Sequence, residues 1–244
     1  MKKILIVMLS FVLINSLSAQ NFKGMLNKAK KEVEDIAGGS GDLSQEKIGN
    51  GLKEALDEGV GKAVEFLSAE NGYLKSPYKI LIPDDAQKIV NKVKSVPGFG
   101  NVEEQLTEKL NRAAESAAKK AKPIFISAIK QMTFKDAFNI LMGDKNAATS
   151  YLDRVTRKQL FSEFMPVIQN SLDEVNARTY WRSVVQAHNK LPFVKKANPE
   201  LDEYVNNKAL DGMFSLVEKK ELDIRDNQSS RTSDLLKEVF SKQD

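Results

Sequence analysis

Hydrophobic residues recur three or four positions apart along almost the whole chain, which is the spacing of one helix face. The longest stripe runs from Ile48 to Leu67, and Ser44 before it suits a helix start. Comparable stripes predict further helices at 84–96, 102–117, 123–129, 134–141, 147–161, 162–175, 177–189, 201–224 and 233–240. Only KILIP at 79–83 suggests extended backbone. We therefore predict an all-α fold, with a single globular domain of about eight or more helices at 44–244.

The stretch KQMTFKDAFNILMG at 130–143 sets the polar pair Thr133 and Asp136 among apolar residues. Such a pair could belong to a small catalytic site. The spacing T-x-x-D is also that of a capping box, in which each side chain bonds an unpaired amide of the first helical turn. Pro123 suits the first turn of the preceding helix, and Gly143 suits the end of the following one. We interpret the motif as the boundary between two helices.

The N-terminal sequence MKKILIVMLSFVLINSLSAQ predicts a secretory signal peptide at 1–19. Lys2 and Lys3 form a positive start, an apolar run follows to Leu17, and small residues precede a cleavage position near Ala19. A retained membrane anchor is the alternative, but the apolar run is shorter than the roughly 20 residues that span a bilayer. We expect a periplasmic or secreted protein.

Residues 20–43 are predicted to form an amphipathic helix followed by a flexible linker. Apolar residues between 22 and 36 make one stripe, and GGSGD at 38–42 ends it. The stripe could fold back onto the main domain, make a peripheral membrane contact or bind a partner protein.

The composition excludes several kinds of site. The chain has no cysteine and a single histidine, His188, which removes disulfides, thiolate metal sites and every motif with two histidines. The formal net charge of +4 falls to +2 once Lys2 and Lys3 leave with the signal peptide, and the remaining basic residues are interspersed with acids. Such a surface does not indicate nucleic-acid binding. Phosphate-loop, dinucleotide and calcium-loop motifs are absent from the sequence, so we predict no cofactor and no metal.

Four strings of the sequence carry a family likeness through their order and spacing. They are NRAAESAAKKAKPIFISAIKQMTFKDAFNILMG, AATSYLDRVT, YVNNKALDGMFSLVEKKELDIRDN and RTSDLLKEVF. Together they resemble a family of exported bacterial envelope proteins, domain of unknown function 4197. The likeness extends from about Leu43 to Phe240, and Met213 stands where the family pattern has leucine. The resemblance implies an exported helical fold, and it implies no activity, substrate or catalytic residue.

The polar residues that could carry chemistry are Lys208 and Asp211, near the edge of the apolar stripe of the 201–224 helix. At this spacing they suit a surface ion pair in which the lysine stem lies along the margin of the core. The same spacing suits a partly desolvated pair that lines a pocket, as catalytic groups do. Arg225 and Arg231 are predicted to cap helix ends, with an anion site as the alternative.

Two functions are compatible with these patterns. The sequence favours a non-enzymatic exported protein that binds a partner or an apolar ligand in the cell envelope, because the helices are amphipathic and catalytic motifs are absent from the sequence. A partner would require an exposed apolar patch, and an apolar ligand would require a lined cavity. The alternative is an enzyme that uses Lys208 or paired carboxylates on an envelope substrate.

Overall fold

The computed structural model of residues 1–244 describes residues 45–93, 100–174, 176–190, 192–193, 196, 198 and 200–241. Contacts divide the chain into two compact units, 1–48 and 49–244, and the second holds the helical body. The predicted signal peptide at 1–19 and the predicted helix and linker at 20–43 lie outside the described residues, as does the side chain of His188. None of the described helices is long and apolar enough to cross a membrane.

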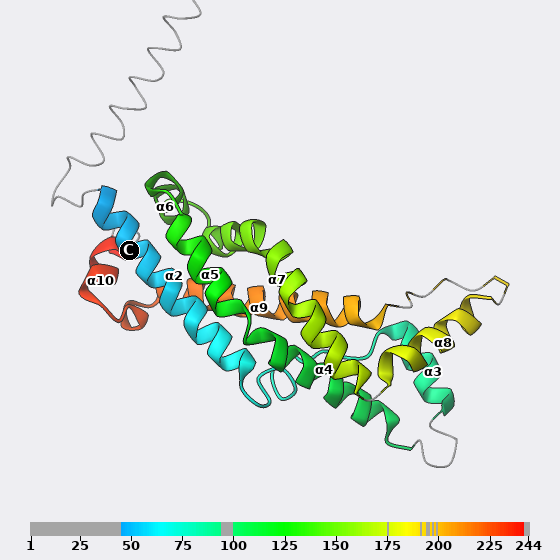
Figure 1. The fold of residues 1–244 in the computed structure, drawn as a ribbon. Helices are drawn as coiled ribbons and strands as arrows, with labels where there is room; N and C mark the ends of the chain where they lie inside the picture. Colours follow the sequence, from blue (N-terminus) through cyan, green and yellow to red (C-terminus); the bar gives the residue numbers. More distant parts are fainter. Residues whose placement is uncertain are drawn as a thin grey trace, which may run out of the picture. The chain divides into compact units, whose positions relative to one another are not determined.

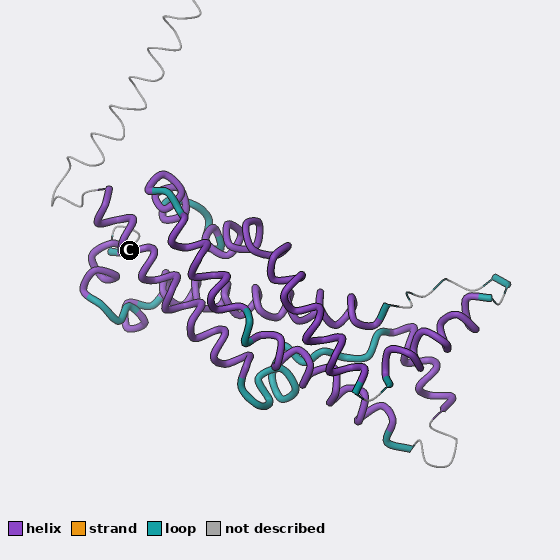
Figure 2. Tube along the Cα trace, in the orientation of Figure 1, coloured by secondary structure: helices purple, strands orange, loops and turns teal. Residues whose placement is uncertain are grey.

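The described part of the chain consists of helices and their connections and contains no strand (Figure 2). In chain order the helices are α2 (Gln45–Ser68), α3 (Asp84–Val93), α4 (Val102–Ala118), α5 (Ala121–Gln131), α6 (Phe134–Leu141), α7 (Ala147–Asp173), α8 (Ala177–Asn189), α9 (Leu201–Asp226), the short 3₁₀ helix η1 (Gln228–Ser230) and α10 (Asp234–Phe240). The prediction of a single all-α domain is confirmed.

Helices α4, α7 and α9 pack against one another at the centre of the fold (Figure 1). The side chains that they contribute to this centre are fully buried. They include Leu110, Ala113, Ala114 and Ala117 from α4, Leu152, Leu160, Phe164 and Ile168 from α7, and Val205, Ala209, Leu210 and Met213 from α9. The alanines of α4 leave room for the larger side chains of its neighbours. On the α5 side, the ring of Phe125 meets Phe214 of α9 edge-on, with ring centroids 5.7 Å apart.

Helix α7 is continuous, so the predicted break between 147–161 and 162–175 was wrong. Pro166 lies inside the helix, where it removes a backbone hydrogen bond and costs about 3 kcal/mol relative to alanine. Phe164 and Ile168 on either side of it are fully buried, and burying such a side chain contributes about 2 kcal/mol. Packing against α4 and α9 therefore outweighs the local cost of the proline.

The predicted capping box at the start of α6 is confirmed. The Thr133 hydroxyl accepts the N–H of Asp136 at 3.1 Å, and the Asp136 carboxylate accepts the N–H of Thr133 at 3.1 Å and its hydroxyl at 2.6 Å. These hydrogen bonds lower the pKa of Asp136. Gly143 follows the helix as predicted, although its φ is outside the left-handed region. The glycine is needed for space, because a Cβ there would lie 2.8 Å from the carbonyl oxygen of Asn139.

The KILIP segment at 79–83 belongs to the connection between α2 and α3 and forms neither a helix nor a strand. The fully buried side chain of Asn111, on α4, forms hydrogen bonds with the backbone of this segment. The Asn111 amide oxygen accepts the N–H of Ile80 at 2.8 Å, and the amide nitrogen donates to the carbonyl of Ile80 at 2.8 Å. Buried backbone groups need such partners, so this asparagine fixes the segment onto α4 at Ile80.

The apolar stripe of α4 predicts that Glu115 and Arg112 face solvent, and for Glu115 this was wrong. Glu115 is only 5% exposed. Its carboxylate accepts the N–H groups of Tyr73 and Leu74, both at 3.2 Å, and the Arg112 guanidinium lies 2.7 Å away. The buried Tyr73 hydroxyl donates to the carbonyl of Ala209 at 2.7 Å, and burial together with the Glu115 charge raises the pKa of Tyr73. The α2–α3 connection is thereby fixed onto α4 and α9.

Candidate functional site

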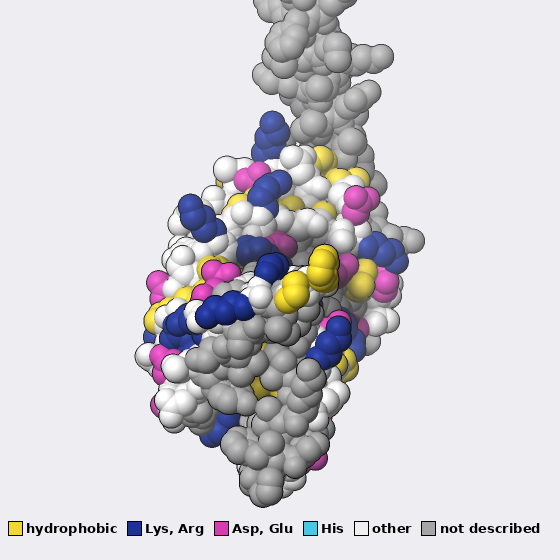
Figure 3. Space-filling model, turned by 90° about the vertical axis from the view of Figure 1, so that its right-hand side faces the viewer, with side chains coloured by type: hydrophobic (Ala, Val, Ile, Leu, Met, Phe, Trp, Pro, Cys, Tyr) yellow, Lys and Arg dark blue, Asp and Glu magenta, His cyan; other side chains and the backbone are white. Residues whose placement is uncertain are grey.

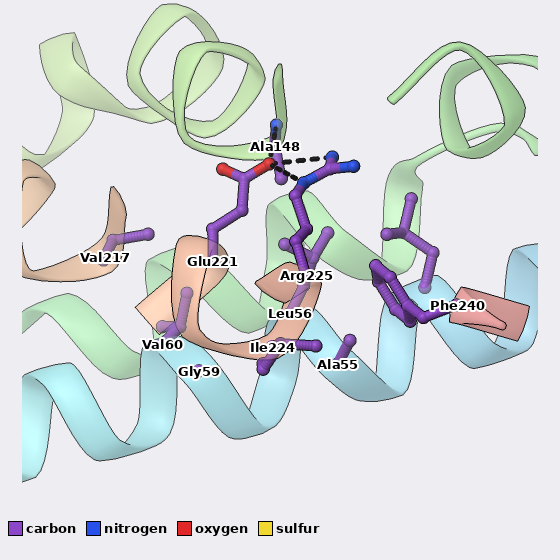
Figure 4. A pocket seen from close by; sticks show the side chains of 11 residues that line it. Ala55, Leu56, Gly59, Val60, Ala148, Val217, Glu221, Ile224, Arg225 and Phe240 are labelled. Carbon is purple, nitrogen blue, oxygen red and sulfur yellow. Dashed lines mark hydrogen bonds and ion pairs between the residues drawn. The ribbon is translucent and has the colours of Figure 1, made fainter. Parts of the chain in front are cut away.

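A buried ion pair on α9 joins the ends of two other helices (Figure 4). The Glu221 carboxylate and the Arg225 guanidinium are 2.9 Å apart, and their side chains are 6% and 5% exposed. Glu221 also accepts the N–H groups of Ala148 at 3.0 Å and Thr149 at 2.8 Å, in the first turn of α7. Arg225 donates to the carbonyl oxygens of the last two residues of α6, at 2.8 and 3.2 Å. Because helix ends leave backbone groups unpaired, this one ion pair supplies partners to both helices.

Arg231 has the same role at the end of α9. Its guanidinium donates to the carbonyl oxygens of Ile224 at 3.1 Å and Arg225 at 2.9 Å. The prediction that Arg225 and Arg231 cap helix ends is therefore confirmed. The cavity beside the Glu221–Arg225 pair has a volume of about 20 Å³, which is room for one water molecule. We assign this region to the stability of the fold.

A larger hollow lies between the connection that precedes α3, the first turns of α4, helix α8 and the beginning of α9. Its volume is about 770 Å³, within the range of small-molecule binding sites. We call it the α9 cleft. The cleft is lined by Leu81, Ile82, Pro83, Asp84, Gln87, Glu103, Thr107, Trp181, Asn198, Glu200, Leu201, Glu203, Tyr204, Asn207 and Lys208.

Two aromatic side chains are held in place at the α9 cleft by hydrogen bonds. The indole N–H of Trp181, which is 6% exposed, donates to the carbonyl of Asn198 at 3.2 Å. The hydroxyl of the half-buried Tyr204 donates to the carbonyl of Leu81 at 3.0 Å. Burial and the negative charge of Asp84 raise the pKa of Tyr204, so its hydroxyl stays protonated and continues to donate. The cleft therefore has aromatic walls of defined position.

Negative charge predominates in the α9 cleft. Its charged lining residues are Asp84, Glu103, Glu200, Glu203 and Lys208. Arg182 lies 2.7 Å from the Glu200 carboxylate and compensates part of the charge. Such a cleft attracts cations and repels anions. Within the described ranges, no three His, Cys, Asp or Glu side chains lie close enough together to hold a metal ion.

The two candidate residues, Lys208 and Asp211, are exposed on the outer side of α9. Asp211 accepts from Arg157 of α7 at 3.1 Å, and the Lys208 ammonium lies 5.9 Å from the centre of the Tyr204 ring. The expected Lys208–Asp211 ion pair is thus not formed among the described residues. Both side chains line a smaller hollow of about 340 Å³, which shares Leu81, Tyr204 and Lys208 with the α9 cleft. A catalytic role for the two residues stays a prediction.

Comparison with known proteins assigns the chain to a family. Residues 42–241 match the family model described as "Protein of unknown function (DUF4197)". The chain belongs to the DUF4197 family. The match includes every helix from α2 to α10 and confirms the resemblance seen in the sequence. No curated protein and no solved structure matches the chain.

The aromatic and acidic lining of the cleft in this DUF4197 chain was not predicted from the sequence. Trp181 and Tyr204 occupy positions on two helices that look like ordinary apolar-stripe positions, and nothing local indicates that the segment before α3 lies beside them. For Glu115 a signal was present. It stands in the string AAESAA, whose four alanines are all buried. An acidic residue that is preceded and followed along a helix by buried residues needs a partner inside the fold.

Proposed function

We propose that this DUF4197 protein is a non-enzymatic binding protein of the cell envelope, and that the α9 cleft binds a cationic segment of a partner protein. The observation that carries the proposal is the cleft lining, which holds four carboxylates, one lysine and two aromatic side chains fixed by hydrogen bonds. A lysine or arginine side chain suits such a cleft. Its charged end pairs with carboxylates, and its stem and charge both interact favourably with aromatic rings. The location in the envelope follows from the predicted signal peptide at 1–19.

An apolar ligand receives less support. The cavity between α2 and α9 is apolar apart from Glu221 and Arg225, and it has room for one water molecule only. The α9 cleft is large enough, but an apolar ligand there would cover charged groups without pairing them, which costs free energy.

The alternative, an enzyme based on Lys208 or paired carboxylates, receives less support, although Lys208 and Asp211 both line a hollow. Lys208 and Asp211 are both exposed, and the Asp211 carboxylate is bonded to Arg157. Catalytic acids, bases and nucleophiles typically occupy partly desolvated positions beside a partner that adjusts their reactivity. A binding function requires no such arrangement.

The fluorescence of Trp181 provides a direct test, because this residue is the only tryptophan of the chain and lines the α9 cleft. The protein would be titrated with a tri-lysine peptide whose ends are blocked and, separately, with the corresponding tri-glutamate peptide at the same ionic strength. The proposal predicts a saturable change in emission with tri-lysine and none with tri-glutamate.

Matched variants locate the binding site. Asp84→Asn combined with Glu203→Gln removes two exposed carboxylates from the cleft, and tri-lysine binding should weaken about tenfold, since an exposed ion pair contributes up to about 1 kcal/mol. Glu54→Gln combined with Asp57→Asn removes the same charge from the exposed side of α2 and should leave binding unchanged. Equal affinities for the two double variants would overturn the assignment to the cleft.

A further inference from the structure

The smaller hollow beside the α9 cleft carries the opposite charge. Its volume is about 340 Å³, and we call it the Lys208 hollow. Its charged lining residues are Lys79, Lys208 and Asp211, and the Asp211 carboxylate is bonded to Arg157. On the face of the molecule shown in Figure 3, by contrast, the described Lys and Arg side chains lie interspersed with Asp and Glu side chains. An acidic cleft adjoining a basic hollow is therefore a local separation of charge.

The polar groups of the Lys208 hollow are available to a ligand. Lys79 and Lys208 are exposed, and neither forms an ion pair with a carboxylate of the described ranges. The Lys208 ammonium lies 5.9 Å from the centre of the Tyr204 ring, at the boundary of the two hollows, because both residues line both. Burial raises the pKa of Tyr78, another lining residue, so its hydroxyl stays protonated. The hollow thus offers two cations and a hydroxyl donor to an anionic group.

The wall of the Lys208 hollow is fixed by the fold. A Cβ at Gly212 would lie 3.1 Å from the Tyr73 ring and 3.3 Å from the Cβ of Tyr78, so the glycine lets this part of the α2–α3 connection lie close against α9. The Tyr73 hydroxyl, which donates to the carbonyl of Ala209, holds the connection there. The position of Tyr78 relative to Lys208 is therefore set by packed residues.

We propose that the Lys208 hollow binds a carboxylate of the same ligand whose basic side chain occupies the α9 cleft. The partner segment is then a chain end whose last residue is lysine or arginine, since such a residue carries both a basic side chain and the main-chain carboxylate. One residue can meet both charges because the two hollows share Tyr204 and Lys208. Capture of a C-terminal carboxylate is a recurring mode of peptide recognition. The inference rests on the function proposed for the α9 cleft and adds which part of the partner enters it.

An internal segment with an acidic residue beside a lysine fits the two hollows less well. It supplies the same charges from two side chains instead of one. Each rotamer-rich side chain that becomes immobilised on binding costs free energy. A basic residue at a chain end therefore satisfies the two hollows at the lower cost in conformational entropy.

The test is isothermal titration calorimetry of the protein, as the cell processes it, with acetylated tri-lysine peptides at one pH and ionic strength. One peptide has a free C-terminal carboxylate, and the other ends in an amide. The free acid should bind about fivefold more tightly, which is the most that one exposed ion pair typically provides. A third peptide, in which glutamate amide follows the lysines, carries its carboxylate on a separate side chain and should bind less tightly than the free acid.

Lys208→Gln should abolish the preference, so that the free acid and the amide bind equally. Lys219→Gln is the matched control, because it removes an exposed lysine from the same helix, outside the lining of both hollows, and should keep the fivefold preference. Both lysines are exposed, so both variants should keep the melting temperature of the wild type.

The possible failures are distinguishable. Equal binding of the free acid and the amide to the wild type would overturn this inference and leave the proposed function standing. A preference that persists in Lys208→Gln would overturn the assignment to the Lys208 hollow, and a glutamate peptide that binds as tightly as the free acid would overturn the assignment to a chain end. Binding of none of the peptides would overturn the proposed function together with the inference.

Discussion

Replacement of Glu221 should destabilise the fold more than its single charge suggests. In Glu221→Gln the side chain keeps its size, but Arg225, 5% exposed, loses its counter-ion inside the protein. Breaking a buried ion pair in this way costs about 3–5 kcal/mol, since the remaining charge is left uncompensated. Most domains are stable by only about 5–15 kcal/mol, so a large part of the total would be lost.

The double variant Glu221→Gln with Arg225→Met should be less damaging than the two single changes predict. It removes both charges, and the glutamine oxygen can still accept from the first turn of α7. The carbonyl oxygens at the end of α6 lose their donors, which costs about 1 kcal/mol for each hydrogen bond. The double variant should therefore lose about 2–3 kcal/mol, and the coupling between the two sites should reach at least about 2 kcal/mol.

Urea unfolding followed by far-ultraviolet circular dichroism measures all these values. Asp226→Asn is the matched control, because Asp226 lies on α9 like Glu221 but forms an exposed ion pair, with Lys145 of the α6–α7 connection. This change should cost less than about 1 kcal/mol. The reasoning is refuted if Glu221→Gln costs no more than this control. It is also refuted if the double variant loses the full sum of the single changes.

Three further predictions concern stability. Asn111→Ala should cost about 2–4 kcal/mol in urea unfolding, because the buried backbone groups of the segment that it pairs with lose their partners; a loss below about 1 kcal/mol would contradict this role. Gly72→Ala should lower the melting temperature, because the added Cβ would lie 2.2 Å from a backbone oxygen. Gly61→Ala, in open space on α2, should raise the melting temperature. Shifts of equal sign would be evidence against this reasoning. The pKa of Asp136 is lowered in the folded state, so the stability that its carboxylate contributes is complete above the unfolded-state pKa of about 3.9 and is lost as the pH falls through the folded-state pKa. Thr133→Ala should therefore reduce the free energy of unfolding by about 1 kcal/mol at neutral pH and by less in acid. Urea titrations at the two pH values would measure the difference.

Features that depend on neighbours along the chain could be predicted from the sequence. The capping box of Thr133 and Asp136 is one example, because both partners lie within a single turn and their spacing identifies the geometry. The helix-capping arginines, Arg225 and Arg231, were predicted from their position beside a polar turn. Hydrophobic spacing gave the other helices in the same way.

Features that depend on tertiary packing could not be predicted. The proline rule predicts a helix break before Pro166, but the buried side chains around it keep α7 continuous. Asn111 is polar, and only the passage of the α2–α3 connection over α4 explains why it is buried. The packing of α8 brings Trp181 to the α9 cleft, and the spacing of residues along the sequence does not predict that contact.

The central claim is that a cationic segment of an envelope protein occupies the α9 cleft. Photocrosslinking in living cells tests it most directly, with a photoreactive amino acid in place of Gln87, which lines the cleft, or of Lys88, its exposed neighbour outside the lining. The account predicts a crosslink from position 87 to a lysine- or arginine-rich peptide of one envelope protein, identified by mass spectrometry. The crosslink should disappear when Asp84→Asn and Glu203→Gln are added. Equal labelling from positions 87 and 88, or a crosslinked peptide without basic residues, would contradict the account.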